Sequence, residues 1–414
     1  MNALSIRVPS TKALVGIVAA ALTALMAASL VAVPAAEAKS KGKKGVVRVM
    51  TRNLYLGADL GPGLDAANLA ELSQGAGKIL RDVDKNDFKL RAKQLAKEIR
   101  SANPDLVGLQ EVALWRTIKP PNVYLPGGDP PKAETVRYDF LRLLLKNLKG
   151  YKKVVVENEF DFETPTDVDD DDSTCFEGNW TGALGPNNQC GVFPGADLTG
   201  RLTMRDVIIA KKKVKTSSND KANFDNLYTP LVAGVTPLPV TRGWTATTAK
   251  VPGSKPFRFV NTHFEAFGNP EEAKCEQAKE LYPEAIAGNS LPVILAGDLN
   301  SDDDTVDGDP ATPELDGTGW DRCAYNYLKS EGLSSLTRGT DNTCCYQGSV
   351  LAPKKVSVYR KEFDHQVDHL MTNSAAKVVR VGKSKATGTR PFRKKGTPAW
   401  GSDHQGVAQA VKIK

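Results

Sequence analysis

The nine residues Pro104–Val112, Pro-Asp-Leu-Val-Gly-Leu-Gln-Glu-Val, indicate the fold class most directly. The apolar run 105–109 follows an Asn-Pro dipeptide, which ends helices, so the run is predicted to be a buried strand. Apolar residues recur every three or four positions over the preceding residues 87–101, which predicts an amphipathic helix. A helix followed directly by a buried strand, with Gln110 and Glu111 at the strand's end, is typical of a sheet covered by helices.

The rest of the chain alternates short β-rich runs with a few helices. A second helix is predicted over residues 135–148 and an extended segment over 152–158. Further strands are predicted at 46–50, 207–210, 257–261, 293–296, 366–371 and 407–413. Irregular surface insertions are predicted at 57–86, 160–200, 301–322 and 338–363. Strands interspersed with helices and few long linkers predict an α/β protein whose two-layered sheet core is covered by helices.

The amino terminus has the layout of a secretory signal peptide. Arg7 and Lys12 precede an alanine-rich apolar stretch, residues 13–33, and Ala36-Glu37-Ala38 resembles a cleavage site. A stretch of this length can also span a bilayer as an anchor. Alanine is only weakly hydrophobic and the cleavage site follows directly, so removal is favoured and the mature chain is expected to begin at Lys39.

Three segments are therefore predicted: a signal peptide over 1–38, a basic linker over 39–45 and a single domain over 46–414. The mature protein is expected to be secreted, monomeric and without a stable membrane anchor.

Hydrophobic and charged fractions of 41% and 25% are those of a globular protein with a core. The formal net charge of +7 suits a polyanionic partner, although dispersed charge also serves solubility.

The six cysteines all lie in the predicted mature chain, which indicates disulfides. Cys175 and Cys190 bracket a Gly- and Asn-rich loop and are expected to pair. None of the cysteine spacings matches a zinc motif. Two of the other four cysteines are adjacent and cannot easily bond to each other, so each is expected to reach one of the remaining two. The adjacent residues are Cys344 and Cys345, and the expected partners are Cys275 and Cys323.

Polar residues follow an apolar run at six places in the chain. Taken singly, each has an ordinary explanation: an asparagine closes a turn, a glutamate starts a helix, and a lone histidine is more often structural than catalytic. Strand ends that gather at one edge of a sheet form the floor of a cleft, where such side chains are held rigidly. The residues concerned are Asn53, Glu111, His263, Asp298 with Asn300, Asp368, and Asp403 with His404.

The order of these places is more specific than any one of them. The motifs are Met50–Leu54, Pro104–Val112, Asn-Thr-His-Phe-Glu-Ala (261–266), Gly-Asp-Leu-Asn-Ser (297–301), Val-Asp-His-Leu (367–370) and Ser-Asp-His (402–404). Together they resemble the ordered motifs of the endonuclease/exonuclease/phosphatase family, from about Val46 to the carboxyl terminus. The resemblance implies a four-layer α/β/β/α sandwich, two facing mixed sheets flanked by helices, with the site at the top of the two sheets.

A phosphate-ester hydrolase must bring hydroxide to a centre surrounded by negative oxygens, so its site must supply positive charge and an oriented water. Glu111 is the expected metal ligand, with Asn53 beside it and Asp403 near the same ion. Oxygen ligands of this kind suit Mg²⁺ or Mn²⁺. With only four histidines and no cysteine–histidine cluster, zinc is the weaker alternative.

The remaining site residues are expected to handle the water, the phosphate and the protons. Asp298 and Asn300 would orient the attacking water and hold the phosphate. His404 would contact the phosphate or act as base, with Asp368 fixing its tautomer. His263 would contact the phosphate and either stabilise the developing charge or protonate the leaving oxygen. The general base stays open, because relatives of the family assign acid and base roles to different members of this set.

Three further polar features have a functional and a structural interpretation. Arg205 resembles a family arginine that meets a substrate phosphate, and an ion pair with Asp206 is the structural alternative. Residues 241–244, Thr-Arg-Gly-Trp, resemble the short motif before the histidine strand and are predicted to form a turn that packs the sheet. His369, on the strand face opposite Asp368, is predicted to be a packing residue.

Two of the predicted insertions carry acidic runs. Clustered carboxylates can hold calcium, whose six to eight ligands are oxygens. Neither run has EF-hand spacing, so a solvated acidic loop is the preferred interpretation and a structural Ca²⁺ site the alternative. The runs are Asp167 with Asp169–Asp172, and Asp302–Asp304 with Asp307 and Asp309.

These expectations describe a secreted, metal-dependent phosphoesterase. Every expected catalytic residue type is present, which favours an enzyme over an inactive binding module of the same fold. Nucleic acid is the preferred substrate, since a soluble basic chain suits a polyphosphate and no apolar segment for reaching a membrane stands out in the sequence. The alternatives are a sphingomyelinase or phospholipase C activity and an inositol-phosphate phosphatase activity, because fold does not decide among substrates.

Overall fold

The computed structural model describes residues 45–121, 132–170, 195–234, 236–266, 270–302, 322–337, 342–346, 349–351, 363, 365–394 and 397–414. Residues 44–414 form one compact unit. The predicted signal peptide, most of the basic linker and the loop between Cys175 and Cys190 lie outside the described residues. Within the described residues, no helix combines the length and the apolar character needed to cross a membrane.

The first sheet is mixed and is built around β1 (Val46–Asn53). This strand runs parallel to β2 (Leu106–Gln110) and antiparallel to β19 (Gly406–Ile413). The strand order is β15-β19-β1-β2-β6-β3-β4, with β16 on β19 and β5 on β6. The other bounds are β3 (Leu114–Ile118), β4 (Thr135–Asp139), β5 (Tyr151–Thr166), β6 (Leu198–Lys211), β15 (Val378–Arg380) and β16 (Lys385–Thr387).

The second sheet is also mixed and has the order β13-β14-β12-β11-β10-β7. Its central strands β11 (Phe257–His263) and β12 (Val293–Asp298) run parallel, and the other pairs are antiparallel. The remaining bounds are β7 (Lys215–Asn223), β10 (Gly243–Lys250), β13 (Ser334–Ser335) and β14 (Asp368–Thr372). Two short ribbons lie outside both sheets: β8 (Leu231–Val232) with β9 (Thr236–Pro237), and β17 (Phe392–Lys394) with β18 (Thr397–Ala399).

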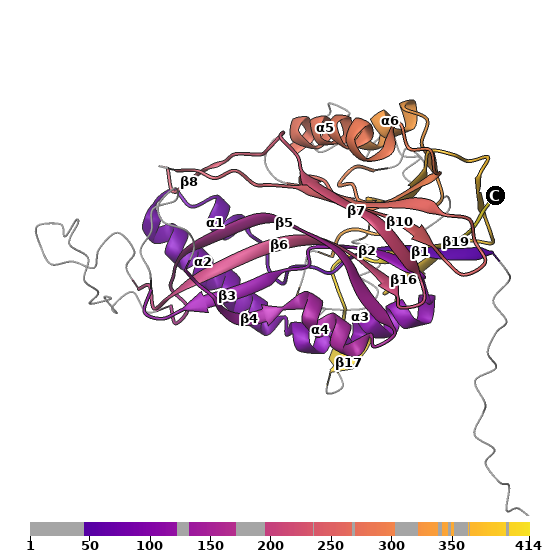
Figure 1. Ribbon diagram of the computed structural model, residues 1–414. Coiled ribbons are helices and arrows are strands. Elements are labelled where there is room, and N and C mark those ends of the chain that lie inside the picture. The colour runs from indigo at the N-terminus through magenta and orange to yellow at the C-terminus, as the bar shows by residue number, and fades with distance from the viewer. Residues whose placement is uncertain are drawn as a thin grey trace, which may run out of the picture. The chain divides into compact units, whose positions relative to one another are not determined.

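The two sheets face each other across a shared apolar layer. Val49 and Leu106 of the first sheet belong to the same buried cluster as Phe259 and Ile294 of the second. Helices α2, α3 and α4 cover the outer face of the first sheet, and α5 and α6 cover that of the second (Figure 1). The bounds are α1 (Gly61–Leu64), α2 (Leu69–Lys85), α3 (Phe88–Ala102), α4 (Phe140–Asn147), α5 (Pro270–Leu281) and α6 (Cys323–Ser330). The expected four-layer α/β/β/α sandwich is confirmed.

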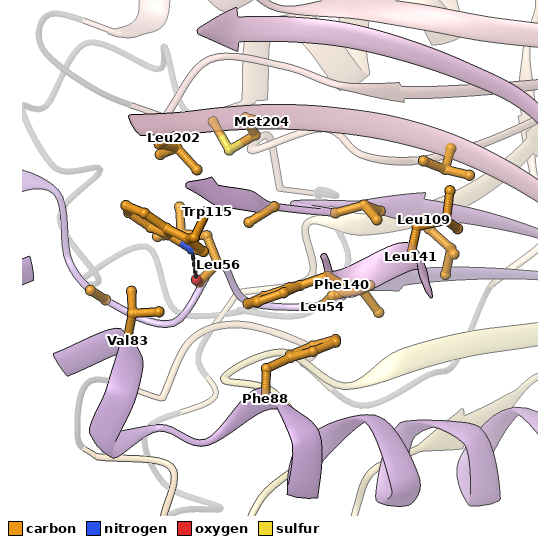
Figure 2. Packing of buried hydrophobic residues seen from close by; sticks show 14 of the residues in the cluster. Leu54, Leu56, Val83, Phe88, Leu109, Trp115, Phe140, Leu141, Leu202 and Met204 are labelled. Carbon is orange, nitrogen blue, oxygen red and sulfur yellow. Dashed lines mark hydrogen bonds between the residues drawn. The ribbon is translucent and has the colours of Figure 1, made fainter. Parts of the chain in front are cut away.

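Helix α3 matches the helix predicted over 87–101 because its periodic face is fully buried. Phe88, Ala92, Leu95 and Ile99 are each 0% exposed. The Asp87 carboxylate accepts a hydrogen bond from Leu90 N at 3.2 Å and caps the first turn. Figure 2 shows the ring of Phe88 over that of Phe140 from α4, with centroids 3.4 Å apart. This packing fixes the helical layer beneath β1 and β2.

The prediction that residues 57–86 are irregular is wrong, because they include α2. Its N-cap Asn68 accepts from Glu71 N, and the Glu71 carboxylate accepts in return from Asn68 Nδ2. Glycines within the helix weaken its sequence signal. A Cβ at Gly75 would collide with the carbonyl oxygen of Pro62, and one at Gly77 with another backbone carbonyl, so close packing requires both glycines. The helix is therefore stabilised by its tertiary contacts.

The helix predicted over 135–148 is confirmed only in its second part, from residue 140 on. Residues 135–139 form strand β4, whose β-branched and aromatic side chains pair with β3. The helix α4 begins only at Phe140, where the Asp139 carboxylate accepts from Arg142 N. The predicted insertion 160–200 is likewise shorter at both ends, since β5 continues to Thr166 and β6 begins at Leu198. Its remaining part, 171–194, lies outside the described residues.

The expected pairing of the adjacent cysteines is also wrong. The structure joins Cys275 to Cys323, because α5 and α6 pack together and hold the two Cα atoms 5.7 Å apart, within the usual range for a disulfide. Cys344 bonds to its neighbour Cys345 across a cis peptide bond. The contact between the two helices decides this pairing of cysteines that are 48 residues apart, and spacing alone does not reveal it.

Candidate active site

The carboxyl ends of β1 and β2 bring the first group of site residues to one edge of the first sheet. Asn53 and Gln110 are register partners at the ends of these parallel strands, so Glu111 follows beside Asn53. Residues 402–404 precede β19, which runs antiparallel to β1, and therefore reach the same edge. The Ser402 hydroxyl donates to Asn53 O at 3.0 Å, which attaches this loop to β1.

The second sheet presents three site residues in adjacent register positions. His263 at the end of β11 pairs with Asp298 at the end of β12. Asp298 in turn pairs with Asp368, the first residue of the antiparallel β14. Because these positions lie at matching strand ends, one edge of the sandwich collects carboxylates and imidazoles from both sheets. We call it the catalytic edge.

A single oxygen, Asp298 Oδ2, joins the two sheets at this edge. It accepts a hydrogen bond from Asn53 Nδ2 at 2.9 Å. It also lies 3.6 Å from His404 Nδ1 and 3.7 Å from His263 Nε2. Three of the residues expected from the sequence are thus brought around one oxygen of a fourth.

The Glu111 carboxylate is fixed by two hydrogen bonds. Its Oε1 accepts from Asn53 Nδ2 at 2.9 Å and its Oε2 from Leu56 N at 2.7 Å. Leu56 O accepts from the indole of Trp115 at 3.1 Å, as Figure 2 shows, so the packed core holds the loop. Glu111 has φ 53°, in the left-handed region that costs a side-chain-bearing residue energy and that clusters at functional sites.

The donor set at Glu111 and Asp403 fits the expected hard cation. Burial and then the Glu111 carboxylate raise the pKa of Asp403 to about 6, against the opposing effects of His404 and Arg91. Two neighbouring carboxylates that repel each other are a set that a divalent cation neutralises. Asn53, the third expected ligand, has its nitrogen committed to two carboxylates and its oxygen to Tyr55 N. Asn53 therefore orients the carboxylates.

A second group of potential ligands lies beside the first. One ligand atom each from Asp298, Asp368 and His404 lies within 4.8 Å of the others, and all three residues are buried. An imidazole binds a metal ion only through an unprotonated nitrogen, so this group would hold a divalent cation only after His404 lost a proton, and it is not the ligand set expected from the sequence.

His404 is held in its protonated form. Its Nδ1 donates to Asp368 Oδ2 at 2.9 Å. Burial lowers the pKa of His404, but Asp368, Asp298 and Asp403 outweigh this effect and raise it well above its usual value. Its other nitrogen, Nε2, lies 3.6 Å from the sulfur of Cys344 and 3.8 Å from that of its disulfide partner. The expected role of Asp368 in fixing the tautomer agrees with this geometry.

His263 is held in the opposite state. Arg242 Nη1 lies 3.2 Å from His263 Nδ1, and because a guanidinium only donates, Nδ1 accepts and the proton sits on Nε2. Arg242 also donates to both oxygens of Glu265, at 3.3 and 3.1 Å. Burial, then Arg242 and His404, lower the pKa of His263 well below its usual value. A neutral imidazole therefore carries its N–H on the side of Asp298.

Asp298 is the carboxyl group whose properties suit proton transfer near neutral pH. Burial raises the pKa of Asp298 to about 7, with a further increase from Asp368 and opposing effects from His404 and Asn53. A pKa near the working pH suits a general base. Asn300 N donates to Asp298 Oδ1 at 3.1 Å, and the Asn300 side chain donates to Phe264 O at 2.9 Å.

The site opens into a pocket of about 260 Å³. Loop residues 55–60 supply one wall and Cys345 with Tyr346 another. Six of the expected site residues line it: Glu111, His263, Asp298, Asn300, Asp403 and His404. Asn53 and Asp368 lie behind this lining and hydrogen-bond to it.

Arg205 is the one expected site residue that the structure does not bring to the pocket. Its guanidinium donates to the carbonyls of Val112 and Ala113 and forms an ion pair with Asp139 at 2.8 Å. These contacts support the turn after Glu111. The structural alternative, a pair with Asp206, is not the pair observed.

Arg242 is the pocket residue that the sequence motif did not identify. The segment 241–244 was expected to be a turn that packs the sheet, but Gly243 is the register partner of His263. The residue before Gly243 therefore reaches the catalytic edge and lines the pocket. A register assignment for β10 against β11 is the signal that would have found Arg242.

The remaining sequence features lie away from the pocket. His369 is 0% exposed, contacts Ser301 O at 2.9 Å and packs against Tyr325, which agrees with a packing role. In the first acidic run, Asp167 and Asp169 have oxygens within 4.8 Å of one from Asp197, an arrangement compatible with the calcium alternative. Most of the second run, from residue 303 on, lies outside the described residues.

Comparison with known proteins points to one family. A family model described as "Endonuclease/Exonuclease/phosphatase family" matches residues 67–404. No curated protein matches the sequence. An endonuclease/exonuclease/phosphatase family protein from Bacteroides thetaiotaomicron is 14% identical, with a TM-score of 0.48 over 90% of this chain and 99% of that one. One from Beutenbergia cavernae is 19% identical, with a TM-score of 0.47 over 89% and 72% of the two chains. The human Nocturnin catalytic domain is 14% identical, with a TM-score of 0.43 over 89% and 94%.

Proposed function

The chain belongs to the endonuclease/exonuclease/phosphatase family, hydrolases that act on phosphate esters, and we propose that it is a secreted, divalent-metal-dependent phosphodiesterase of nucleic acid. The observation that carries the proposal is the environment of Asp298 Oδ2. It lies beside a neutral imidazole N–H and a protonated imidazole, at 3.7 and 3.6 Å. Phosphodiester hydrolysis requires a general base, a hydrogen-bond donor and a positive charge close together, and Asp298, His263 and His404 supply them in that order.

Each residue then has a defined task. Asp298, with its pKa near 7, accepts a proton from the attacking water. The His404 imidazolium offsets the charge that develops on the phosphate oxygens, and Asp368 keeps it charged and oriented. The Nε2–H of His263 donates to a phosphate oxygen, while Arg242 prevents its ring from turning. The expected acid role of His263 is the weaker one, because a neutral imidazole is a poor proton donor.

Glu111 and Asp403 would hold the divalent cation. When bound, that cation supplies Lewis-acid polarisation of a phosphate oxygen. Asn53 Nδ2 donates to one oxygen of Glu111 and to one oxygen of Asp298, and so orients both carboxylates. Activity is therefore expected to disappear in excess chelator and to return with Mg²⁺ or Mn²⁺. Full activity in chelator would contradict the metal requirement.

Nucleic acid is supported by the chemistry of the pocket and the charge of the chain. The pocket is polar at its floor, and the net charge of +7 favours a polyanion. The test compares hydrolysis of plasmid DNA, RNA, sphingomyelin liposomes and soluble inositol phosphates at one Mg²⁺ concentration and two salt concentrations. Nuclease activity should fall as salt rises, since polyanion binding releases counterions.

A second candidate, a phosphodiester lipid, is favoured by an apolar pocket next to the catalytic one. Leu60 lines both pockets, and the apolar one has a volume of about 70 Å³. No apolar segment for reaching a membrane was evident in the sequence, but the structure leaves Leu231 59% exposed, directly before Val232 in this pocket's wall. Release of phosphocholine without cleavage of DNA or RNA would select this candidate.

Secretion is part of the proposal and rests on the amino-terminal sequence. The positive start, the apolar stretch and Ala36-Glu37-Ala38 support cleavage before Lys39. Amino-terminal sequencing of protein from the culture medium should return Lys39. A chain that begins at Met1 in the medium would contradict signal removal.

A further inference from the structure

The edge of the sandwich opposite the catalytic edge carries a groove that the proposed chemistry does not use. Strand β6 ends there at Lys211, beside the start of β2, and β10 ends there at Lys250 after beginning beside His263. The groove has a volume of about 780 Å³. Five of its lining side chains are lysines, and we call it the lysine groove: Lys152, Lys212, Lys213, Lys215 and Lys250.

The positive charge of the lysine groove is not offset from within it. No acidic residue lines the groove. None of its five lysines forms an ion pair with a carboxylate in the part of the chain that the structure describes. Two carboxylates on the adjoining strands β5 and β7 are paired with other cations, Glu157 with Lys221 and Asp220 with Arg258.

A neighbouring lysine responds to this charge. The pKa of Lys211 is lowered by burial first and also by Lys213 and Arg48, although its ion pair with Asp105 acts in the opposite direction. Lys152 is held in place by a hydrogen bond from its Nζ to Thr216 Oγ1 at 3.4 Å. Like charges collected in one groove repel each other, and an anion with several charges relieves that repulsion.

We propose that the lysine groove binds the phosphates of a nucleic-acid chain, as a second contact away from the catalytic pocket. The inference rests on the proposed nuclease function. Lys250 lies seven positions after Gly243, the residue of β10 at the catalytic edge, which corresponds to about 23 Å at about 3.3 Å per residue. A small ester cannot span this distance, whereas a polymer can occupy both places, and the second contact raises its effective concentration at the pocket.

The side chains between the lysines favour a phosphate chain over a lipid surface. They are threonine, serine and small apolar residues, and no aromatic or leucine side chain lines the groove. Membrane-surface binding would need an apolar face beside the charges. Lysine ammonium groups bind phosphates as point charges, without demanding a particular base sequence.

The test measures binding of a labelled 30-base-pair DNA duplex to the full chain by fluorescence anisotropy, in chelator so that no cleavage occurs. Each phosphate contact contributes about −0.9 to the slope of log affinity against log salt. The variant Lys212→Ala/Lys213→Ala should therefore lose about 2 from the magnitude of this slope and bind about tenfold more weakly at low salt. The matched variant Lys93→Ala/Lys97→Ala, which removes two exposed lysines of α3, should bind like the wild type.

Hydrolysis of bis(p-nitrophenyl) phosphate separates this inference from the proposed function. Both variants should hydrolyse this small diester at the wild-type rate, while Lys212→Ala/Lys213→Ala cleaves plasmid DNA more slowly. No hydrolysis by the wild type would refute the proposed function and leave the duplex-binding result intact. Equal duplex affinity of the wild type and Lys212→Ala/Lys213→Ala, or an equal loss in the α3 variant, would overturn the inference. Loss of binding to anionic phospholipid vesicles alone would also overturn it.

Discussion

Two histidines face the same carboxylate oxygen from two walls of one pocket, and they differ in charge: the pKa of His404 is raised, which favours the cation, and that of His263 is lowered, which favours the neutral ring. His404 Nδ1 and His263 Nε2 lie 3.6 and 3.7 Å from Asp298 Oδ2, and both rings are buried. Burial alone would make both neutral. The difference lies in the partner of each Nδ1, which is a carboxylate for His404 and a guanidinium for His263. One partner residue therefore decides whether an imidazole serves as a cation or as a neutral donor.

Removing the guanidinium should have the largest effect, because Arg242 is 1% exposed and compensates buried carboxylates. Arg242→Gln removes the guanidinium that compensates the Glu265 carboxylate, and the pKa of Glu159, which burial raises to about 8 against the lowering effect of Arg242, should rise further. We expect a loss of about 3 to 5 kcal/mol in the free energy of unfolding. Urea unfolding measures it, and Arg242→Gln/Glu265→Gln, which removes both charges, should recover part of the loss. Equal losses in the two variants would show that the Arg242–Glu265 ion pair is not the source of the lost stability.

Removing either imidazole should lower turnover while the fold survives. His404→Ala loses the cation and His263→Ala the neutral donor, and each should reduce kcat by about a hundredfold or more, about 2.7 kcal/mol. Steady-state kinetics on a soluble diester measures this, with circular dichroism as the check on folding. His365→Ala, which changes a half-exposed histidine paired with Asp302, is the matched control. Near-normal kcat in either pocket variant would remove that histidine from the mechanism.

The protonation difference itself can be observed in the metal-free protein by NMR titration of the four histidines. His404 should remain protonated well above pH 6.5, and His263 should remain neutral well below it. The two histidines make the folding stability depend on pH in opposite directions. The contribution of His404 is present below pH 6.5 and is lost as pH rises through its folded-state pKa. The contribution of His263 is present above pH 6.5 and is lost as pH falls. Two ordinary titrations near pH 6.5 would contradict the comparison.

The smallest effect is expected from the disulfide beside His404. Both sulfurs lie more than 3.5 Å from His404 Nε2, and sulfur is a weak hydrogen-bond partner. Cys344→Ser/Cys345→Ser should therefore change kcat by no more than about threefold, roughly 0.6 kcal/mol. The same kinetic assay checks this. A loss as large as that of His404→Ala would make the cysteine pair part of the machinery that positions the imidazole.

The two histidines also differ in how much of their environment could be predicted. Asp368 and His404 both stand in short motifs, and their contact was expected from the sequence before the structure showed it at 2.9 Å. Arg242 was expected to pack a turn. Its role depends on the register of β10 against β11, and a shift of one residue would point it to the other face of the sheet.

Helix α2 shows that the fold, too, could be predicted only in part from the local sequence. Gly75 and Gly77 weaken its local signal, and they are required only because the backbone carbonyls of Pro62 and Asp167 approach the helix closely. Arg205 shows the same limit for a charged residue. Its motif suggested a contact with the substrate phosphate, but its guanidinium forms an ion pair with Asp139, which ends a strand that was predicted to be helix. In both cases the competing partner is distant in the sequence.

The sequence by itself determined the central strands of both sheets, the helix α3, the family and the chemistry-bearing residue types, because periodicity and short motifs are local properties of the chain. Only the tertiary structure decided which carboxylates lie side by side, which imidazole has the raised pKa, and how the four described cysteines pair. Those properties depend on distances of a few ångströms between strand ends and on burial. Both arise when two sheets pack face to face, and neither is encoded at any single position.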